Sequence, residues 1–317
     1  MSPAASAARL VGAATALAAG ALAWSFVEAR WYALREVSVP VLPPGQAPLR
    51  VLHVADLHLT PSQPDKVAWV RDLASLDPHL VVDTGDNWAH DDAMGPLMTA
   101  LEPLLARPGV FVLGSNDYVA PQPKNPARYL LPDARRAPAR PPHQLPWREL
   151  VRRLTSAGWL DLDNRRGVLD VDGRRISFVG TDDAHLDRDR MPPAGGPDDA
   201  RTRADEPVDL HLGVTHAPYR RILEAMHDDD ADLVIAGHTH GGQLAVPLWG
   251  ALVTNCDLDP ARAKGLHGWP GPRPDAPGGA GSTWLHVSAG LGTSPYAPVR
   301  FACRPEATLL TLTAVPG

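Results

Sequence analysis

Seven side chains that can bind a metal ion stand directly after short apolar runs of the chain. They are Asp56, His58, Asp86, Asn116, His216, His238 and His240. The strings that carry them read VADLH, DTGDN, LGSND, VTH and AGHTHGG. In an open α/β sheet, ligands bind outside the carboxyl ends of the strands, so five such runs would bring these side chains to one rim. Carboxylate, imidazole and amide-oxygen ligands, with no thiolate among them, are typical of Zn, Mn or Fe(II) sites.

Each motif alone has an ordinary structural explanation. A Gly-Asp pair is common in turns, and a single His after a strand is more often a hydrogen-bonding residue than a ligand. The ordered conjunction of all seven side chains, each at the end of an apolar run, favours a metal site. The set is too large for one tetrahedral ion. It predicts two divalent ions, Mn, Fe or Zn, that share a bridging carboxylate, and it does not identify the metal.

The order D-x-H, GD, a GN-like string, H and GHTHGG resembles the signature of the calcineurin-like metallophosphoesterases. The resemblance extends from about Leu49 to the C-terminus. The longer string GHTHGGQLAVP, followed by SAGLGT, VRF and RPE, is similar to one branch of that family. This branch is the membrane-anchored bacterial phosphohydrolases, whose relatives include cell-envelope phosphodiesterases.

The resemblance implies an α/β fold, a four-layer α/β/β/α metallophosphoesterase sandwich with the metals at the strand ends. It also implies a role for each of the seven side chains. The first ion would be bound by Asp56, His58 and His240, the second by Asn116, His216 and His238, and Asp86 would bridge the two. The activity implied is metal-dependent phosphoester hydrolysis by an activated water.

The chain departs from the family pattern at the residue after Asn116. The family usually has GNH there, and that His is held to assist the leaving group. Here the string reads GSNDY, so Asp117 stands in the place of the His. Either Asp117 acts as the catalytic acid or another residue does. The second candidate is His185, which follows another apolar run in the string GTDDAH.

The substrate class stays open at the level of sequence. Branch resemblance favours a phosphodiester, and a membrane tether favours a membrane- or envelope-associated substrate, with lipid-linked phosphoesters included. A phosphomonoesterase or a nucleotide-lipid pyrophosphatase is an alternative within the class. A non-catalytic metal-binding scaffold at the membrane is a rival from another class. A metallo-amidohydrolase is a further rival, disfavoured because Asn116 is a typical ligand only in the phosphoesterase pattern.

Alternating strand and helix patterns surround these motifs and predict a layered α/β domain. The predicted strands are Leu49–Ala55, His79–Asp83, Val110–Leu113, Ile176–Gly180, Leu210–Val214, Leu233–Ala236, Trp284–Ser288 and Thr308–Thr313. The predicted helices are Asp65–Leu76, Asp92–Ala106, Trp147–Ala157 and Tyr219–His227. Three segments rich in Pro or Gly read as long loops: Val119–Pro146, Met191–Pro207 and Pro260–Gly281. The first could be a lid or substrate rim, or a surface insertion with no role.

Composition and charge limit the kinds of binding partner that we expect. The chain has 317 residues, 44% of them hydrophobic, and a net charge of −6. It has no basic run, so we expect no nucleic acid partner. Its two cysteines, Cys256 and Cys303, lack metal-ligand spacing and leave one optional disulfide. Nothing in the sequence indicates an oligomeric state.

The N-terminus carries a membrane signal. Leu10–Val27 has no charged residue and is close to the length of a spanning helix, with aromatic residues at its C-terminal end. We expect an uncleaved anchor. A secreted protein after cleavage at Ala21-Leu22-Ala23 and a buried helix remain alternatives. The basic residues on the two sides nearly balance, so orientation is undecided. The predicted division is an anchor at 1–32, a linker at 33–48 and a metallophosphoesterase domain at 49–317.

Overall fold

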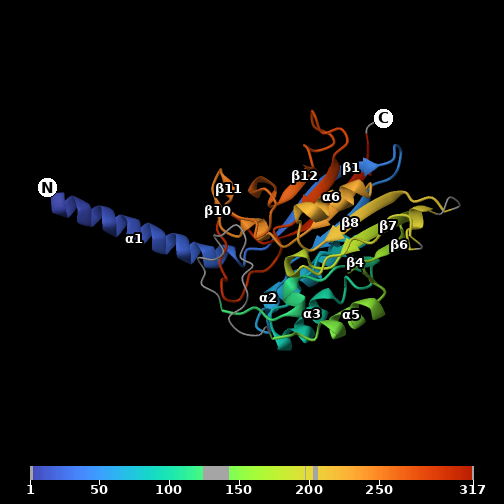
Figure 1. Ribbon diagram of the computed structural model, residues 1–317. Coiled ribbons are helices and arrows are strands. Elements are labelled where there is room, and N and C mark those ends of the chain that lie inside the picture. The colour runs from blue at the N-terminus through green and yellow to red at the C-terminus, as the bar shows by residue number, and fades with distance from the viewer. Residues whose placement is uncertain (1–2, 124–142, 197, 203–205, 316–317) are drawn as a thin grey trace.

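Two six-stranded β-sheets pack face to face and form the centre of the molecule (Figure 1). The computed structural model describes residues 3–123, 143–196, 198–202 and 206–315. The first sheet has the order β1 (Ala33–Leu42), β14 (Glu306–Ala314), β2 (Leu49–Val54), β3 (Leu80–Asp83), β4 (Gly109–Phe111) and β5 (Leu160–Asp161). The second has the order β12 (Gly265–Trp269), β13 (Thr283–Val287), β9 (Leu233–Ala236), β8 (Leu210–Thr215), β7 (Arg174–Thr181) and β6 (Arg166–Val171).

Most strands in each sheet are parallel, so their carboxyl ends meet at one edge. In the first sheet β2, β3, β4 and β5 are parallel, and β14 runs antiparallel to β2. In the second sheet β7, β8, β9 and β13 are parallel, while β6 and β12 run antiparallel to their neighbours. This topology positions the strand-end side chains of both sheets for one site.

Helices cover the outer faces of the two sheets and complete four layers. On the first sheet lie α2 (Pro64–Asp72), α3 (Met94–Leu101) and α5 (Trp147–Ser156), and on the second lies α6 (Arg220–Asp228). The short helix α4 (Ser115–Tyr118) follows β4. Short elements among the described residues include the 3₁₀ turns Leu73–Leu76, Asp91–Ala93, Ala184–Leu186, Ala200–Thr202, His240–Gly242 and Pro260–Arg262, and the hairpin strands β10 (Ala245–Val246) and β11 (Gly250–Ala251).

The alternation of side chains along each central strand explains the layering. In β2, Leu49 and Val51 face the second sheet, while Leu52 and Val54 pack against the helices of the first. A strand buried on both faces reads as a continuous apolar run, which is how these strands were predicted. The predicted α/β/β/α sandwich is therefore confirmed, together with the four predicted helices, whose bounds shift by a few residues.

A linker was predicted at residues 33–48, but residues 33–42 are part of the first sheet. They form β1, which pairs in parallel with β14 from Ala33 to Leu42 at the edge of the first sheet. The segment Pro260–Gly281 was predicted to be a loop, but part of it forms the strand β12. The predicted lid segment Val119–Pro146 lies largely outside the described residues. Both cysteines are buried and free, so the optional disulfide is not formed.

The N-terminal helix α1 (Pro3–Glu28) extends away from the sheets (Figure 1). Its segment Arg9–Glu28 is long and apolar enough to cross a membrane, with a mean hydropathy of 1.8, and is almost entirely exposed. Among the residues of α1 whose burial is described, only Ser25 and Glu28 at its C-terminal end are buried. There the Glu28 carboxylate accepts hydrogen bonds from the backbone N–H groups of Ala302 (3.1 Å) and Cys303 (2.6 Å). These two hydrogen bonds to the buried Glu28 carboxylate attach the end of α1 to the domain.

Candidate metal centre

Five strand ends deliver the seven predicted side chains to one place between the sheets. Asp56 and His58 follow β2, Asp86 follows β3, Asn116 lies on α4 after β4, His216 follows β8, and His238 and His240 follow β9. Six of the seven are buried, Asn116 being half-buried. The structure thus brings together every residue that the sequence nominated as a metal ligand.

Asp56, His58, Asp86 and His240 form the first half of the site. Their ligand atoms all lie within 4.8 Å of one another. His58 Nε2 is 3.2 Å from His240 Nε2 and 3.3 Å from Asp86 Oδ2. Metal–nitrogen bonds of about 2.0–2.1 Å place two ligand nitrogens roughly 3.3 Å apart around a tetrahedral ion. The spacing of the two imidazoles fits a shared cation.

Asn116, His216 and His238 form the second half, on the other side of Asp86. His238 Nδ1 lies 3.3 Å from His216 Nε2, and His216 Nε2 lies 3.6 Å from Asp86 Oδ1. The Asn116 amide contacts Asp86 Oδ2 at 2.7 Å, and its backbone N–H donates to Asp86 Oδ1 at 2.7 Å. Asp86 therefore faces both halves, the position that a bridging carboxylate requires.

Backbone carbonyls fix the rings of three histidines. His216 Nδ1 contacts Thr84 O at 2.7 Å, and His240 Nδ1 contacts Gly292 O at 3.0 Å. His238 Nε2 contacts Asn255 O at 3.3 Å. A carbonyl only accepts, so each of these nitrogens carries the proton and the other nitrogen presents a lone pair to the site. Outer hydrogen bonds of this kind orient metal-binding imidazoles.

Burial keeps these imidazoles neutral. It lowers the pKa of His216, and it lowers the pKa of His238 and of His240 well below the ordinary range. Neutral imidazole is the form that binds metal.

The carboxylates respond in opposite directions. Burial raises the pKa of Asp56 well above its usual range, and the neighbouring Asp86 carboxylate adds to this. Burial also opposes ionisation of Asp86, but the adjacent His216 and His58 hold its pKa well below its usual range. Two buried carboxylates beside one another favour a cation between them, because a bound ion is the largest local charge in such a site. The donor set fits divalent metal.

The backbone around the site is strained. Positive φ angles occur at Asp56 (51°), His58 (41°), Asp86 (55°), His238 (70°) and His240 (49°). Non-glycine residues rarely adopt this left-handed region, and such outliers concentrate at functional sites. Gly114 is required for a separate reason, because a Cβ there would collide with the Asp86 carboxylate and the His216 ring.

The structure does not favour Asp117 as a catalytic acid. Its carboxylate accepts hydrogen bonds from the backbone N–H groups of Asp86 (2.7 Å), Asn87 (2.8 Å) and Gly114 (2.9 Å). It is fully buried behind the site and ties the loops after β3 and β4 together. The side chain that replaces the expected His therefore supports the ligands from behind.

His185, the second candidate, is half-buried and lies beside the second half of the site. Its ring centroid is 4.8 Å from that of His238, and its Nδ1 contacts the Tyr219 hydroxyl at 3.1 Å. Asp183 caps the turn that carries it, accepting from the backbone N–H groups of His185 and Leu186. His185 is thus held beside the second half of the site, where a leaving group could be reached.

The sequence analysis missed two residues that hold the site. Tyr219 positions His185, and its only signal was its place three residues after His216. Arg300 is buried and donates to Ala289 O (2.7 Å), Gly292 O (2.7 Å) and Gly290 O (3.1 Å). It also reaches His240 O at 3.3 Å. Arg300 stands in the string VRF, which carried only a branch resemblance.

Comparison with known proteins agrees with this geometry. The sequence profile described as calcineurin-like phosphoesterase matches residues 49–242, which include all seven residues of the centre. The chain is 27% identical over 294 residues to the phosphodiesterase YaeI of Escherichia coli, covering 90% of each protein. It is 28% identical over 162 residues to the uncharacterized metallophosphoesterase YkuE of Bacillus subtilis, covering 50% of this chain and 48% of that protein.

Two further similarities are to a bovine protein and to a solved structure. The chain is 29% identical over 302 residues to a bovine transmembrane protein with a metallophosphoesterase domain, covering 90% of this chain and 58% of that protein. Among solved structures, the NAD nucleotidase NadN of Haemophilus influenzae aligns with a TM-score of 0.43 at 15% identity, covering 81% of this chain and 49% of that one.

Proposed function

Because the chain belongs to the calcineurin-like phosphoesterase family, we propose that it hydrolyses phosphodiesters with two divalent metal ions. The position of Asp86 carries the proposal. Its two oxygens face His58 on one side and His216 on the other, at 3.3 and 3.6 Å. In this proposal Asp56, His58 and His240 hold one ion, and Asn116, His216 and His238 hold the other. The metal is Mn, Fe or Zn.

Bound metal ions would supply Lewis-acid stabilisation of the phosphoryl oxygens and lower the pKa of a water. The residues of the chain orient the ligand atoms and donate a proton. The neutral imidazoles of His216, His238 and His240 present lone pairs, and their outer hydrogen bonds prevent rotation. The attacking water would release a proton to solvent, and its oxygen would form a bond to phosphorus as the bond from phosphorus to the leaving oxygen breaks. His185 gives its proton to that oxygen, and Tyr219 holds the ring in place.

The preference for diesters and for a membrane-associated substrate has separate support. A relative that aligns along most of the chain carries the name phosphodiesterase. The apolar helix α1 is long enough to span a bilayer, and a bovine relative is named as a transmembrane protein. The proposed substrate is a phosphodiester at the membrane surface, such as a lipid-linked one.

The test uses the full chain in detergent, stripped of metal with a chelator. Hydrolysis of bis-p-nitrophenyl phosphate and of p-nitrophenyl phosphate is then measured with added Mn²⁺, Zn²⁺, Fe²⁺ or Mg²⁺. We expect turnover only after metal is returned, with the diester hydrolysed faster. A faster monoester would replace the diesterase proposal by a phosphomonoesterase. Two bound metals with no turnover on any phosphoester would favour a metal-binding scaffold.

A further inference from the structure

An exposed apolar hairpin comes shortly after His240, the last proposed metal ligand in the sequence. Strands β10 and β11 are joined by a tip that contains Leu248 and Trp249. Leu248 is fully exposed and Trp249 is 82% exposed, while Val246 and Leu252 are also exposed at the flanks. Single exposed apolar residues are ordinary, but a contiguous group indicates an interaction surface.

Leu248 also has an unusual backbone. Its φ angle of 67° lies in the left-handed region, which a leucine rarely adopts. A strained conformation persists when contacts compensate for it. Among the described residues no packing covers this side chain, since Leu248 is fully exposed. A partner outside the folded domain would supply the missing contacts.

The hairpin and the membrane-length helix are held by the same strip of chain, residues 300–303. On one side the Arg300 N–H donates to Ser25 O at 2.9 Å, and the Cys303 N–H donates to Glu28 at 2.6 Å. On the other side Phe301 pairs with the base of the hairpin. The Phe301 N–H donates to Gln243 O at 3.1 Å, and the Ala245 N–H donates to Phe301 O at 2.8 Å. Figure 1 shows β10 and β11 beside the point where α1 leaves the sheets.

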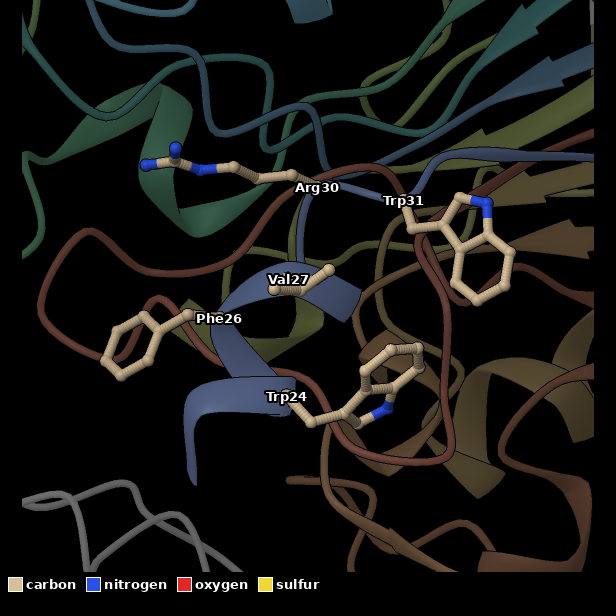
Figure 2. Close-up of a pocket in the computed structure, with 5 residues that line it drawn as sticks. All are labelled: Trp24, Phe26, Val27, Arg30 and Trp31. Carbon is tan, nitrogen blue, oxygen red and sulfur yellow. The ribbon is translucent and has the colours of Figure 1, made fainter. Parts of the chain in front are cut away.

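The end of α1 has the residues of a membrane interface. Trp24, Phe26 and Trp31 are exposed there, and the two tryptophan rings meet edge to face at 5.9 Å. Arg30 lies in the same region, and these residues with Val27 line an open hollow of about 730 Å³ (Figure 2). The Arg304 guanidinium stacks 4.0 Å over the Trp31 ring. Aromatic rings and cations together are typical of the headgroup level of a bilayer.

We propose that the tip of the β10–β11 hairpin, Leu248 and Trp249, is a second membrane contact that enters the same bilayer surface as α1. The inference rests on the membrane anchoring in the proposed function. The occupant is a phospholipid bilayer, because the tip is continuous through residues 300–303 with the aromatic and cationic end of α1. A helix alone leaves the domain free to tilt, and a second contact fixes its orientation.

The contact has a consequence for the metal centre. The 3₁₀ turn His240–Gly242 carries a proposed ligand and leads into the hairpin after two residues. Gly242 packs so closely on Ala251 of β11 that a Cβ at Gly242 would collide with it. A hairpin inserted in the headgroup layer would therefore hold the centre at the membrane surface, within reach of phosphodiester headgroups.

The test places an environment-sensitive fluorophore at single cysteines of the full chain in phosphatidylcholine–phosphatidylglycerol nanodiscs. The native Cys256 and Cys303 are buried, and the unlabelled parent measures their background. Leu248→Cys reports the hairpin, Leu17→Cys reports the exposed middle of α1, and Asp170→Cys on β6 is the matched exposed control. Nitroxide-labelled lipids quench only probes that reach the bilayer. Bound metal and thermal unfolding are compared with the parent to show that each variant is folded.

We expect blue-shifted emission and several-fold stronger quenching at position 248 than at position 170. A probe at 248 that behaves as at 170, while the probe at 17 is quenched, overturns the hairpin contact and leaves the anchor intact. Blue-shifted emission at 248 without lipid quenching also overturns it, because a protein partner or second copy would then cover the tip. Unquenched probes at both 17 and 248 would remove the anchor too. None of these readouts depends on hydrolysis.

A second measurement needs no label. Brominated lipids quench tryptophans that lie in the bilayer, and Trp249→Tyr removes one such tryptophan while keeping an aromatic side chain. We expect the quenched fraction of total tryptophan fluorescence to fall in the variant. An unchanged quenched fraction contradicts insertion of the tip.

Discussion

Individual side chains in the centre have divided tasks. Four imidazoles and two carboxylates face one another, and backbone carbonyls decide which nitrogen of three rings is free to bind metal. The Asp117 carboxylate supports the loops that carry the centre, because it accepts hydrogen bonds from three backbone N–H groups. His185 is half-buried and lies beside His238. Asp117, at the position of the usual family His, thus ties two loops together, and His185 on a different loop is the proposed acid.

His185→Gln should reduce turnover in a way that depends on the leaving group. General acid catalysis typically contributes about 100- to 10,000-fold. An alkyl phosphodiester, whose leaving oxygen needs a proton, should lose that much in kcat, and bis-p-nitrophenyl phosphate should lose far less. The measurement is kcat for both substrates in the variant and the parent. Equal losses on the two substrates would show that His185 does not act as an acid.

Asp117→Ala should act on stability first. It leaves three buried backbone N–H groups without an acceptor, so the free energy of unfolding should fall by about 3 kcal/mol or more. Asp117→Asn keeps one acceptor oxygen and should lose less. Thermal and denaturant unfolding of the two variants measure the difference. A fully stable Asp117→Ala that has lost turnover would instead restore Asp117 as a catalytic group.

Secondary structure elements were predicted well where burial dictates the pattern. The strands that carry the centre are short, apolar on both faces and followed by polar ligands, so both their existence and their ends were readable. β1 was missed because its sequence ALREVSVPVL mixes charges and a proline, which an edge strand tolerates and a central strand does not. β12 was missed because Gly265 and Gly268 stand in a segment rich in Gly and Pro.

The positions of the proposed ligands were predictable for the same reason, whereas the residues that support them were not. Each ligand follows a predicted strand, and the direction of the strands sends them to one edge. Arg300 and Tyr219 act from loops or helix starts, where no periodicity reveals a partner. Their roles depend on tertiary contacts with His240 and His185 that local patterns do not encode.

Arg300→Met should weaken metal binding without removing a ligand. Arg300 links the turn of His240 to the loop 289–292, and loss of an outer support typically costs 10- to 100-fold in metal affinity. Arg304→Met is the matched control. It also donates to backbone carbonyls, of Trp31 and Tyr32, but at the end of α1. Metal affinity measured by competition with a chromophoric chelator should fall only for Arg300→Met. Equal affinities in the two variants would contradict the positioning role.

At the scale of the whole molecule, the two sheets meet over a buried histidine pair. His53 Nδ1 of β2 lies 3.1 Å from His286 Nδ1 of β13. Burial lowers the pKa of His53 well below its ordinary range and that of His286 to about 3. In the unfolded chain both would titrate near about 6.5. Between pH 7 and 5 the two histidines therefore bind protons in the unfolded state and stay neutral in the folded state.

The free energy of unfolding should fall as the pH drops through this window. The contribution of the pair is complete above about pH 6.5 and declines by about 1.4 kcal/mol per pH unit for each histidine. His286→Asn removes one titrating group and keeps a polar partner for His53, so its slope should be shallower by that amount. Urea unfolding of the detergent-solubilised chain at pH 7, 6 and 5 measures both slopes. Identical slopes would contradict this assignment.

In the proposed function, Asp86 joins two metal ions in one catalytic centre. Metal content by elemental analysis and kcat on bis-p-nitrophenyl phosphate should be measured together for the parent, Asp86→Ala and the exposed control Asp92→Ala. We predict about two metals per chain and full turnover in the parent and the control. Asp86→Ala should bind fewer metals and lose more than roughly 100-fold in kcat, beyond the effect of an outer support. A folded Asp86→Ala protein with two metals and near-parental turnover would contradict the bridging role of Asp86.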